Sequence, residues 1–152
     1  MKIHKNIFLE SERKQMLSLV KNKIKNLGDD FPGLQTPADL HKNTQAKTFY
    51  NKIKKYHKGY KVHKSWGLCS NGDLICWHKH TYPVVKSIVY ILNSKNSMGP
   101  IFLEERKQSN WDKIKVTNCP QNSLIIFDSR LLHSTPCHLK EKRYSIAIDL
   151  ID

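Results

Sequence analysis

The stretch YKVHKSWGLCSNGDLICWHKH, residues 60–80, marks the point where the chain changes its pattern. Before it, apolar residues recur every three or four positions, as on one face of a helix. From Tyr60 on, they alternate with polar residues, as on a β-strand with one buried face. Asn71-Gly72 in its middle is a dipeptide typical of a two-residue hairpin turn. The stretch therefore predicts two strands, residues 60–70 and 73–80, joined by a tight turn.

Short apolar or alternating segments continue to the end of the chain and predict further strands. They cover residues 84–92, 100–105, 112–116, 123–128 and 143–150. We therefore expect the second part of the chain to be a β core over residues 59–152.

The segment before residue 60 predicts helices. One helix is expected over residues 8–27, ended by Gly28, and a second is expected to start with Thr36 as its N-cap and to run to about Tyr56. We interpret residues 1–58 as helical support for the β core. The chain, residues 1–152, is thus predicted to form one domain that is mostly β with N-terminal helices.

The formal net charge of +13 is the strongest signal in the composition. It would suit a polyanion such as nucleic acid, but lysine outnumbers arginine 22 to 4, whereas phosphate recognition favours arginine. Nucleic acid is therefore kept as an alternative partner. No apolar run is long enough to span a membrane, and the N-terminus has no apolar signal core. Four cysteines without CxxC spacing indicate reduced thiols. We expect a cytoplasmic protein with no membrane partner.

His78 and His80 are separated by one residue, and on a strand such residues face the same way. Two imidazoles in this arrangement can reach one metal ion, but they can equally be ordinary half-exposed histidines. More specific is the order of residues that follows. His133 comes just after the apolar segment SLIIFD, and Arg143 and Ser145 open the last predicted strand.

This ordered set resembles the iron(II)- and 2-oxoglutarate-dependent oxygenases, in particular the branch related to prolyl hydroxylases. The segments SIVYILN, MGPIFLEE, NSLIIFDSRLLHSTP and KRYSIAIDL are similar to successive core strands of that family. The resemblance implies a double-stranded β-helix, which is a jelly-roll barrel, with Fe(II) and 2-oxoglutarate as cofactors. It also implies a dioxygenase that hydroxylates its substrate and releases succinate and CO2.

The resemblance assigns roles residue by residue. His78 is implied as the first metal ligand and His133 as the distal one. Arg143 would pair with the remote carboxylate of 2-oxoglutarate, and Ser145 would donate a hydrogen bond beside it. Ser87 and Ile91 match positions that often line the cosubstrate pocket. No catalytic side chain is implied beyond the metal centre.

One position departs from the family pattern, in which the usual triad is HxD…H. His80 stands where the carboxylate is expected. It can itself bind the metal and complete a three-histidine centre, which is the reading that we favour. Asp128 can instead replace the missing carboxylate, the third position can be open, or metal binding can have been lost. A neutral ligand makes the centre more positive, so the scaffold is better supported than the reaction.

Three other functions remain. A cupin-like all-histidine metal dioxygenase fits the spacing of Gly72, His78 and His80, but the glutamate expected soon after is absent. A nucleic-acid-acting oxygenase would suit the charge, and a non-catalytic basic jelly-roll binding module would make the histidines incidental. The sequence names no substrate, so a protein segment and a small molecule are both open.

Overall fold

Two antiparallel sheets make up the core, in a computed structural model that describes residues 1–26, 34–70, 77–94, 98–104, 113–135 and 142–152. The larger sheet has the strand order β1-β8-β5-β10-β4-β3-β2, and the smaller has the order β7-β6-β9. The strands are β1 (Lys2–Lys5), β2 (Lys25–Asn26), β3 (Leu34–Gln35), β4 (Lys61–Ser70), β5 (Lys86–Asn93), β6 (Met98–Glu104), β7 (Lys113–Asn118), β8 (Ser123–Asp128), β9 (His133–Ser134) and β10 (Arg143–Ile151).

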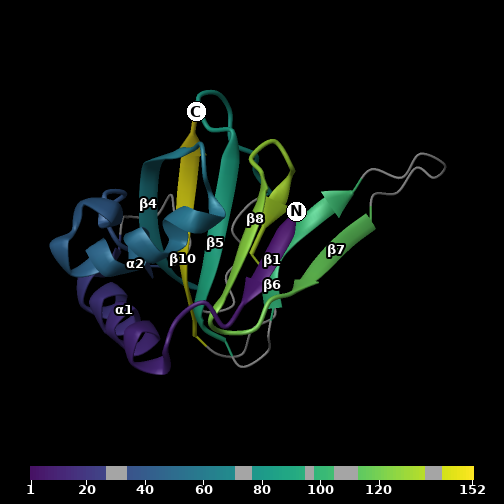
Figure 1. The fold of residues 1–152 in the computed structure, drawn as a ribbon. Coiled ribbons are helices and arrows are strands. Elements are labelled where there is room, and N and C mark those ends of the chain that lie inside the picture. The colour runs from purple at the N-terminus through teal and green to yellow at the C-terminus, as the bar shows by residue number, and fades with distance from the viewer. Residues whose placement is uncertain (27–33, 71–76, 95–97, 105–112, 136–141) are drawn as a thin grey trace.

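The helical elements cover one face of the larger sheet. They are α1 (Glu10–Lys23), the 3-10 turns η1 (Leu40–Lys42) and η2 (Thr44–Ala46), α2 (Lys47–Ile53) and η3 (Lys54–Tyr56). Figure 1 shows α1 and α2 gathered beside β4 and β10, on the opposite side of the molecule from β6 and β7. Their apolar residues share one core with the outward-facing residues of β5, β8 and β10, such as Ile88, Leu124 and Ile146. None of the helices in the described ranges is long and apolar enough to cross a membrane.

Alternation along the strands separates this outer core from an inner one. On β5, Ile88 and Tyr90 face the helices, whereas Val89 and Ile91 face the smaller sheet. The inner core joins Ile91, Ile125 and Phe127 of the larger sheet to Phe102 and Cys119. The second part of the chain is therefore mostly β, as the alternating pattern predicted, and its two packed sheets form a sandwich of the jelly-roll type, as the resemblance implied.

The N-terminal segment differs from its prediction in three places. The helix predicted over residues 8–27 ends at Lys23, and residues 25–26 form the strand β2, which pairs with β3. Residues 2–5 form a strand, β1, which pairs with β8 and so places the chain terminus at the edge of the larger sheet. The start predicted for the second helix, at Thr36, is wrong, although its predicted end near Tyr56 agrees with α2 and η3. The backbone N–H of Thr36 donates to the Gly67 carbonyl at 2.9 Å, and its hydroxyl accepts from the Gly67 N–H at 3.0 Å. A hydroxyl used in this way cannot cap a helix, and α2 begins only at Lys47.

The strand predicted over residues 73–80 is also wrong in its described part. Residues 77–80 form no ladder, and only His78 makes a single β-bridge, to His133. Asn71-Gly72 and Gly28 lie outside the described residues, so the hairpin turn and the helix stop remain predictions.

Gly67 sets how closely α1 packs on β4. A Cβ atom at this position would lie 2.6 Å from Val20 Cγ1 and 2.8 Å from Val20 Cγ2, closer than real contacts allow. Val20 is fully buried in the outer core, so it has no free space to move into.

We expect Gly67→Ala to lower the free energy of unfolding by about 1–3 kcal/mol, because it overpacks this contact. Urea denaturation followed by circular dichroism measures the change. Lys64→Ala, an exposed position on the same strand, is the matched control and should leave the midpoint nearly unchanged. Equal midpoints for Gly67→Ala and the wild type would contradict the tight packing.

Candidate metal centre

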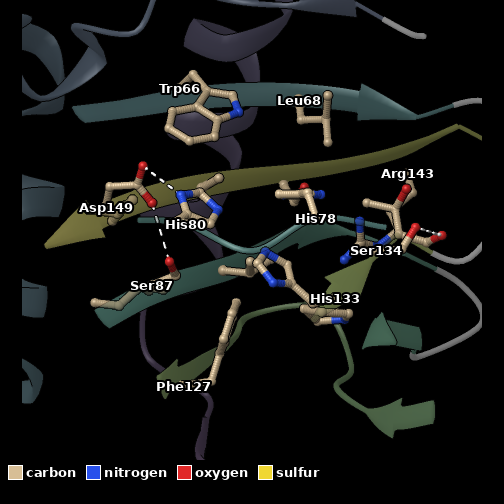
Figure 2. A pocket seen from close by; sticks show the side chains of 17 residues that line it. Trp66, Leu68, His78, His80, Ser87, Phe127, His133, Ser134, Arg143 and Asp149 are labelled. Carbon is tan, nitrogen blue, oxygen red and sulfur yellow. Dashed lines mark hydrogen bonds and ion pairs between the residues drawn. The ribbon is translucent and has the colours of Figure 1, made fainter. Parts of the chain in front are cut away.

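A pocket lies between the two sheets, and residues from both line it (Figure 2). The inward-facing positions of β10 form much of one wall, because Arg143, Ser145, Ala147 and Asp149 alternate with residues of the outer core. The remaining lining residues come from β4, β5, β6, β8, β9 and the segment before β5, and include Trp66, Leu68, His78, His80, Ser87, Val89, Pro100, Phe127, His133 and Ser134.

Backbone hydrogen bonds hold the histidine-bearing segments together. The N–H of His78 donates to the His133 carbonyl at 3.0 Å, and the N–H of His133 donates back to the His78 carbonyl at 2.9 Å. The N–H of His80 donates to the Ser129 carbonyl at 2.9 Å. The segment that carries His78 and His80 is thus tied at both residues to the chain that leads into β9.

The three histidines predicted as metal ligands converge in this pocket. His78, His80 and His133 each offer one ring nitrogen, and these atoms all lie within 4.8 Å of one another. The rings of His78 and His133 are 4.3 Å apart between centroids, and Phe127 packs against His133 at 4.8 Å. Three imidazoles that face one point are a donor set that fits a divalent transition metal such as iron(II).

In two of these rings, a hydrogen-bond acceptor outside the cluster determines which ring nitrogen is protonated and which is available to a metal. Nδ1 of His133 lies 2.7 Å from the Leu131 carbonyl, and Nδ1 of His80 lies 3.0 Å from Asp149 Oδ2. Because a carbonyl and a carboxylate can only accept, both Nδ1 atoms carry the proton, and Nε2 keeps the lone pair that a metal needs. Burial lowers the pKa of His133 to about 4, so its ring is neutral at physiological pH.

Arg143 is the most buried cation of the pocket. Its side chain is 1% exposed, and its Nε donates to the Met98 carbonyl at 3.1 Å. Neither terminal nitrogen, Nη1 or Nη2, has a hydrogen-bond partner among the described residues. Burial lowers the pKa of Arg143 to about 10, so the guanidinium is still charged at neutral pH. A buried cation with two unpaired terminal NH2 groups is a site for a carboxylate, whose two oxygens can accept from both.

The other predicted site residues divide into two groups. Ser145, two residues along β10 from Arg143, and Ser87 on β5 both line the pocket. Ile91 is fully buried but belongs to the inner core with Phe102 and Ile125, and it is not among the lining residues. Its prediction as a residue that lines the pocket therefore finds no support in the geometry.

Asp128, the alternative third ligand, lies outside the histidine cluster. It follows Phe127, which faces the pocket, so its side chain points the other way. Its carboxylate contacts Arg130 at 3.0 Å and Lys86 at 3.5 Å. The Arg130 guanidinium holds the pKa of Asp128 well below its usual range. These contacts make Asp128 a surface ion-pair residue.

Asp149 is the site residue that the sequence reasoning missed. It is 5% exposed and lines the pocket, with its carboxylate between His80 and Ser87 (Figure 2). The signal that could have found it is strand parity, because Asp149 is six residues from Arg143 and so on the same face of β10. An acidic residue on the inward face of an apolar strand needs an explanation.

Comparisons with known proteins bear on the fold. No protein-family model and no curated protein sequence matches the chain significantly. Solved structures do match. The non-haem α-ketoglutarate-dependent epimerase SnoN from nogalamycin biosynthesis has a TM-score of 0.77 and 9% identity, over 99% of this chain and 76% of SnoN.

Two further structures cover nearly the whole chain. A prolyl hydroxylase from Trichoplax adhaerens, in complex with a hypoxia-inducible factor peptide, has a TM-score of 0.71 and 16% identity, over 99% of this chain and 83% of its own. HygX from Streptomyces hygroscopicus, with nickel and 2-oxoglutarate bound, has a TM-score of 0.69 and 10% identity, over 98% and 81%. At these identities the similarity establishes the architecture: the chain has the jelly-roll fold of the iron- and 2-oxoglutarate-dependent oxygenases, as the resemblance of its sequence predicted.

Proposed function

We propose that the protein is a non-haem iron(II)- and 2-oxoglutarate-dependent dioxygenase that hydroxylates a protein segment or a small molecule. The observation that carries this proposal is the combination of two features in one pocket. Three imidazoles converge on one point, and a buried guanidinium with two unpaired nitrogens lines the same cavity. A metal-binding module alone would not need the second feature, and a cupin-like dioxygenase would not need it either.

His78, His80 and His133 would hold the iron. Bound iron(II) with 2-oxoglutarate supplies oxygen activation, in which the cosubstrate is oxidatively decarboxylated to succinate and CO2 while the substrate gains one oxygen atom. The protein's own residues orient and enclose these groups. Phe127 and the inner core close the floor of the pocket and exclude water from it.

Arg143 and Ser145 would bind the remote carboxylate of 2-oxoglutarate. The two terminal nitrogens of Arg143 match the two oxygens of a carboxylate, and the hydroxyl of Ser145 lies on the same face of β10. Binding of the anion would neutralise a buried charge that has no counter-charge among the described residues, which is a source of affinity and of selectivity for a dicarboxylate.

The structural neighbours support iron and 2-oxoglutarate as cofactors. They catalyse different reactions, so the reaction of the substrate has to be determined by experiment. HygX has a structure with 2-oxoglutarate bound, and SnoN one with Fe3+ and α-ketoglutarate. The neighbours include an epimerase and a carbocyclase as well as prolyl hydroxylases. Hydroxylation is the reaction that we propose for this chain, and succinate release is its general readout whichever bond of the substrate reacts.

We expect His78→Ala and His133→Ala each to abolish iron(II) binding, measured by anaerobic isothermal titration calorimetry on purified protein. Each variant removes one of three ligands that the pocket brings together. Lys79→Ala, an exposed residue between His78 and His80, is the control and should bind one iron per chain like the wild type. If both histidine variants kept full affinity, the proposed metal centre would be excluded.

Arg143→Ala should weaken 2-oxoglutarate binding to the iron-loaded protein while leaving iron affinity intact. Loss of a buried charge-assisted pair costs about 2–5 kcal/mol, which corresponds to roughly 30-fold or more in the dissociation constant. Calorimetric titration of 2-oxoglutarate under anaerobic conditions measures it, and Lys142→Ala, the exposed neighbour, is the matched control. An unchanged dissociation constant for 2-oxoglutarate in Arg143→Ala would remove Arg143 from the cosubstrate site.

A further inference from the structure

The carboxylate of Asp149 sits directly behind one of the three converging histidines. Its Oδ2 accepts from His80 Nδ1 at 3.0 Å, and its Oδ1 accepts from the Ser87 hydroxyl at 3.3 Å. Asp149 is 5% exposed, and within the described part of the chain no lysine or arginine forms an ion pair with it. A buried carboxylate is costly unless its oxygens are paired. Here both oxygens are used, and the histidine is the closer partner.

The register of the larger sheet explains how the three residues meet. Asp149 on β10 lies opposite Ser87 on β5, so the two side chains extend from neighbouring strands toward the same face. His80 reaches the pair from the segment before β5, where its backbone N–H is bound to Ser129. The Ser87–Asp149–His80 chain therefore joins two strands and a loop behind the candidate metal centre (Figure 2).

The charge of the centre gives this contact its chemical meaning. Three neutral imidazoles contribute no negative charge, whereas the triad that the sequence resembles contains one carboxylate ligand. Position 80 has an imidazole in place of that carboxylate, and the carboxylate nearest to it is now Asp149, one hydrogen bond further from the metal position. A carboxylate that accepts from the far nitrogen of a ligand histidine fixes its tautomer and raises its basicity.

We propose that Asp149 is a positioning residue of the metal centre. It holds His80 with Nε2 toward the metal. Its carboxylate also places a negative charge next to the His80 imidazole, which compensates for the carboxylate ligand that the altered triad lacks. This inference rests on the proposed function, because it requires His80 to be a ligand. It also gives Ser87 a role other than the contact with the cosubstrate that was predicted from the sequence. Ser87 orients the second oxygen of Asp149.

The first test compares metal affinity in Asp149→Ala and Asp149→Asn. Loss of a partner behind a ligand histidine typically weakens metal binding about 10–100-fold, and we expect Asp149→Ala to fall in that range. Asparagine still accepts from Nδ1 but carries no charge, so Asp149→Asn should bind with intermediate affinity. Competition of iron(II) or cobalt(II) with a chelator measures this without any turnover, and the visible absorption of the cobalt protein reports a changed ligand field.

Asp128→Asn is the matched control, because it neutralises a carboxylate near the pocket that points away from the cluster. Its metal affinity and cobalt spectrum should equal those of the wild type. Loss of metal in Asp128→Asn, with Asp149→Asn unaffected, would move the carboxylate of the centre to Asp128 and overturn the assignment.

A double-mutant cycle separates positioning from a merely structural role. If Asp149 acts through His80, Asp149→Ala should have no further effect on metal affinity in a His80→Ala background. His80→Asp restores a carboxylate ligand directly, so it should rescue the affinity that Asp149→Asn loses. Equal effects of Asp149→Ala with and without His80 would overturn the inference and leave Asp149 a packing residue.

The outcomes also distinguish this inference from the proposed function. If the wild type binds no metal, or binds it independently of His78 and His133, the proposed function fails. If the wild type binds metal through these histidines and the Asp149 variants match it in affinity and spectrum, only the role of Asp149 fails.

Discussion

The alternation of side chains along β10 is the constraint on which the rest of the structure depends. This strand lies inside the larger sheet, bonded to β5 on one side and β4 on the other. Its outward residues, such as Ile146 and Ile148, pack under the helices. Its inward residues include Arg143 at one end of the pocket and Asp149 at the other (Figure 2). A single strand thus holds the core together and sets the distance between the two charged groups of the site.

Burial of two charged residues on the inner face of this strand lowers the stability of the fold, and this cost indicates a function. A strand packed only for stability would bury apolar side chains on both faces, as parallel and sandwich cores do. Here Arg143 is buried with two nitrogens unpaired among the described residues, while Asp149 is buried with both oxygens paired. The unpaired nitrogens of Arg143 are suited to bind an anion. The hydrogen bonding of Asp149 is complete within the chain, as expected of a group that supports a neighbouring ligand.

The backbone pairing of His78 with His133 joins segments 55 residues apart and determines the geometry of the histidine cluster. Two reciprocal backbone hydrogen bonds fix the positions of these two residues, and the side chains of His78 and His133 therefore start from fixed points. His80 has a different support, a backbone bond to Ser129 and a side-chain bond to Asp149. The proposed third ligand, His80, thus depends on contacts that a carboxylate at this position would not require, and position 80 is where the chain departs from the pattern that it resembles.

Local pattern was sufficient for the core strands β4–β8 and β10 and for most of α1, because period-two alternation and helical spacing act over a few residues. The order of His78, His133 and Arg143 along the chain, through its resemblance to a known family, indicated them as candidate site residues, and all three line one pocket. Tertiary structure decided what depends on distant partners. Thr36 does not begin a helix because its hydroxyl is bonded to the Gly67 N–H, and β1 forms because it pairs with β8. Asp128 on β8 turns toward Lys86 on the neighbouring strand β5, and Asp149 reaches His80 across 69 residues of sequence. Such pairings are made by the folded sheet, and no local pattern of the sequence contains them.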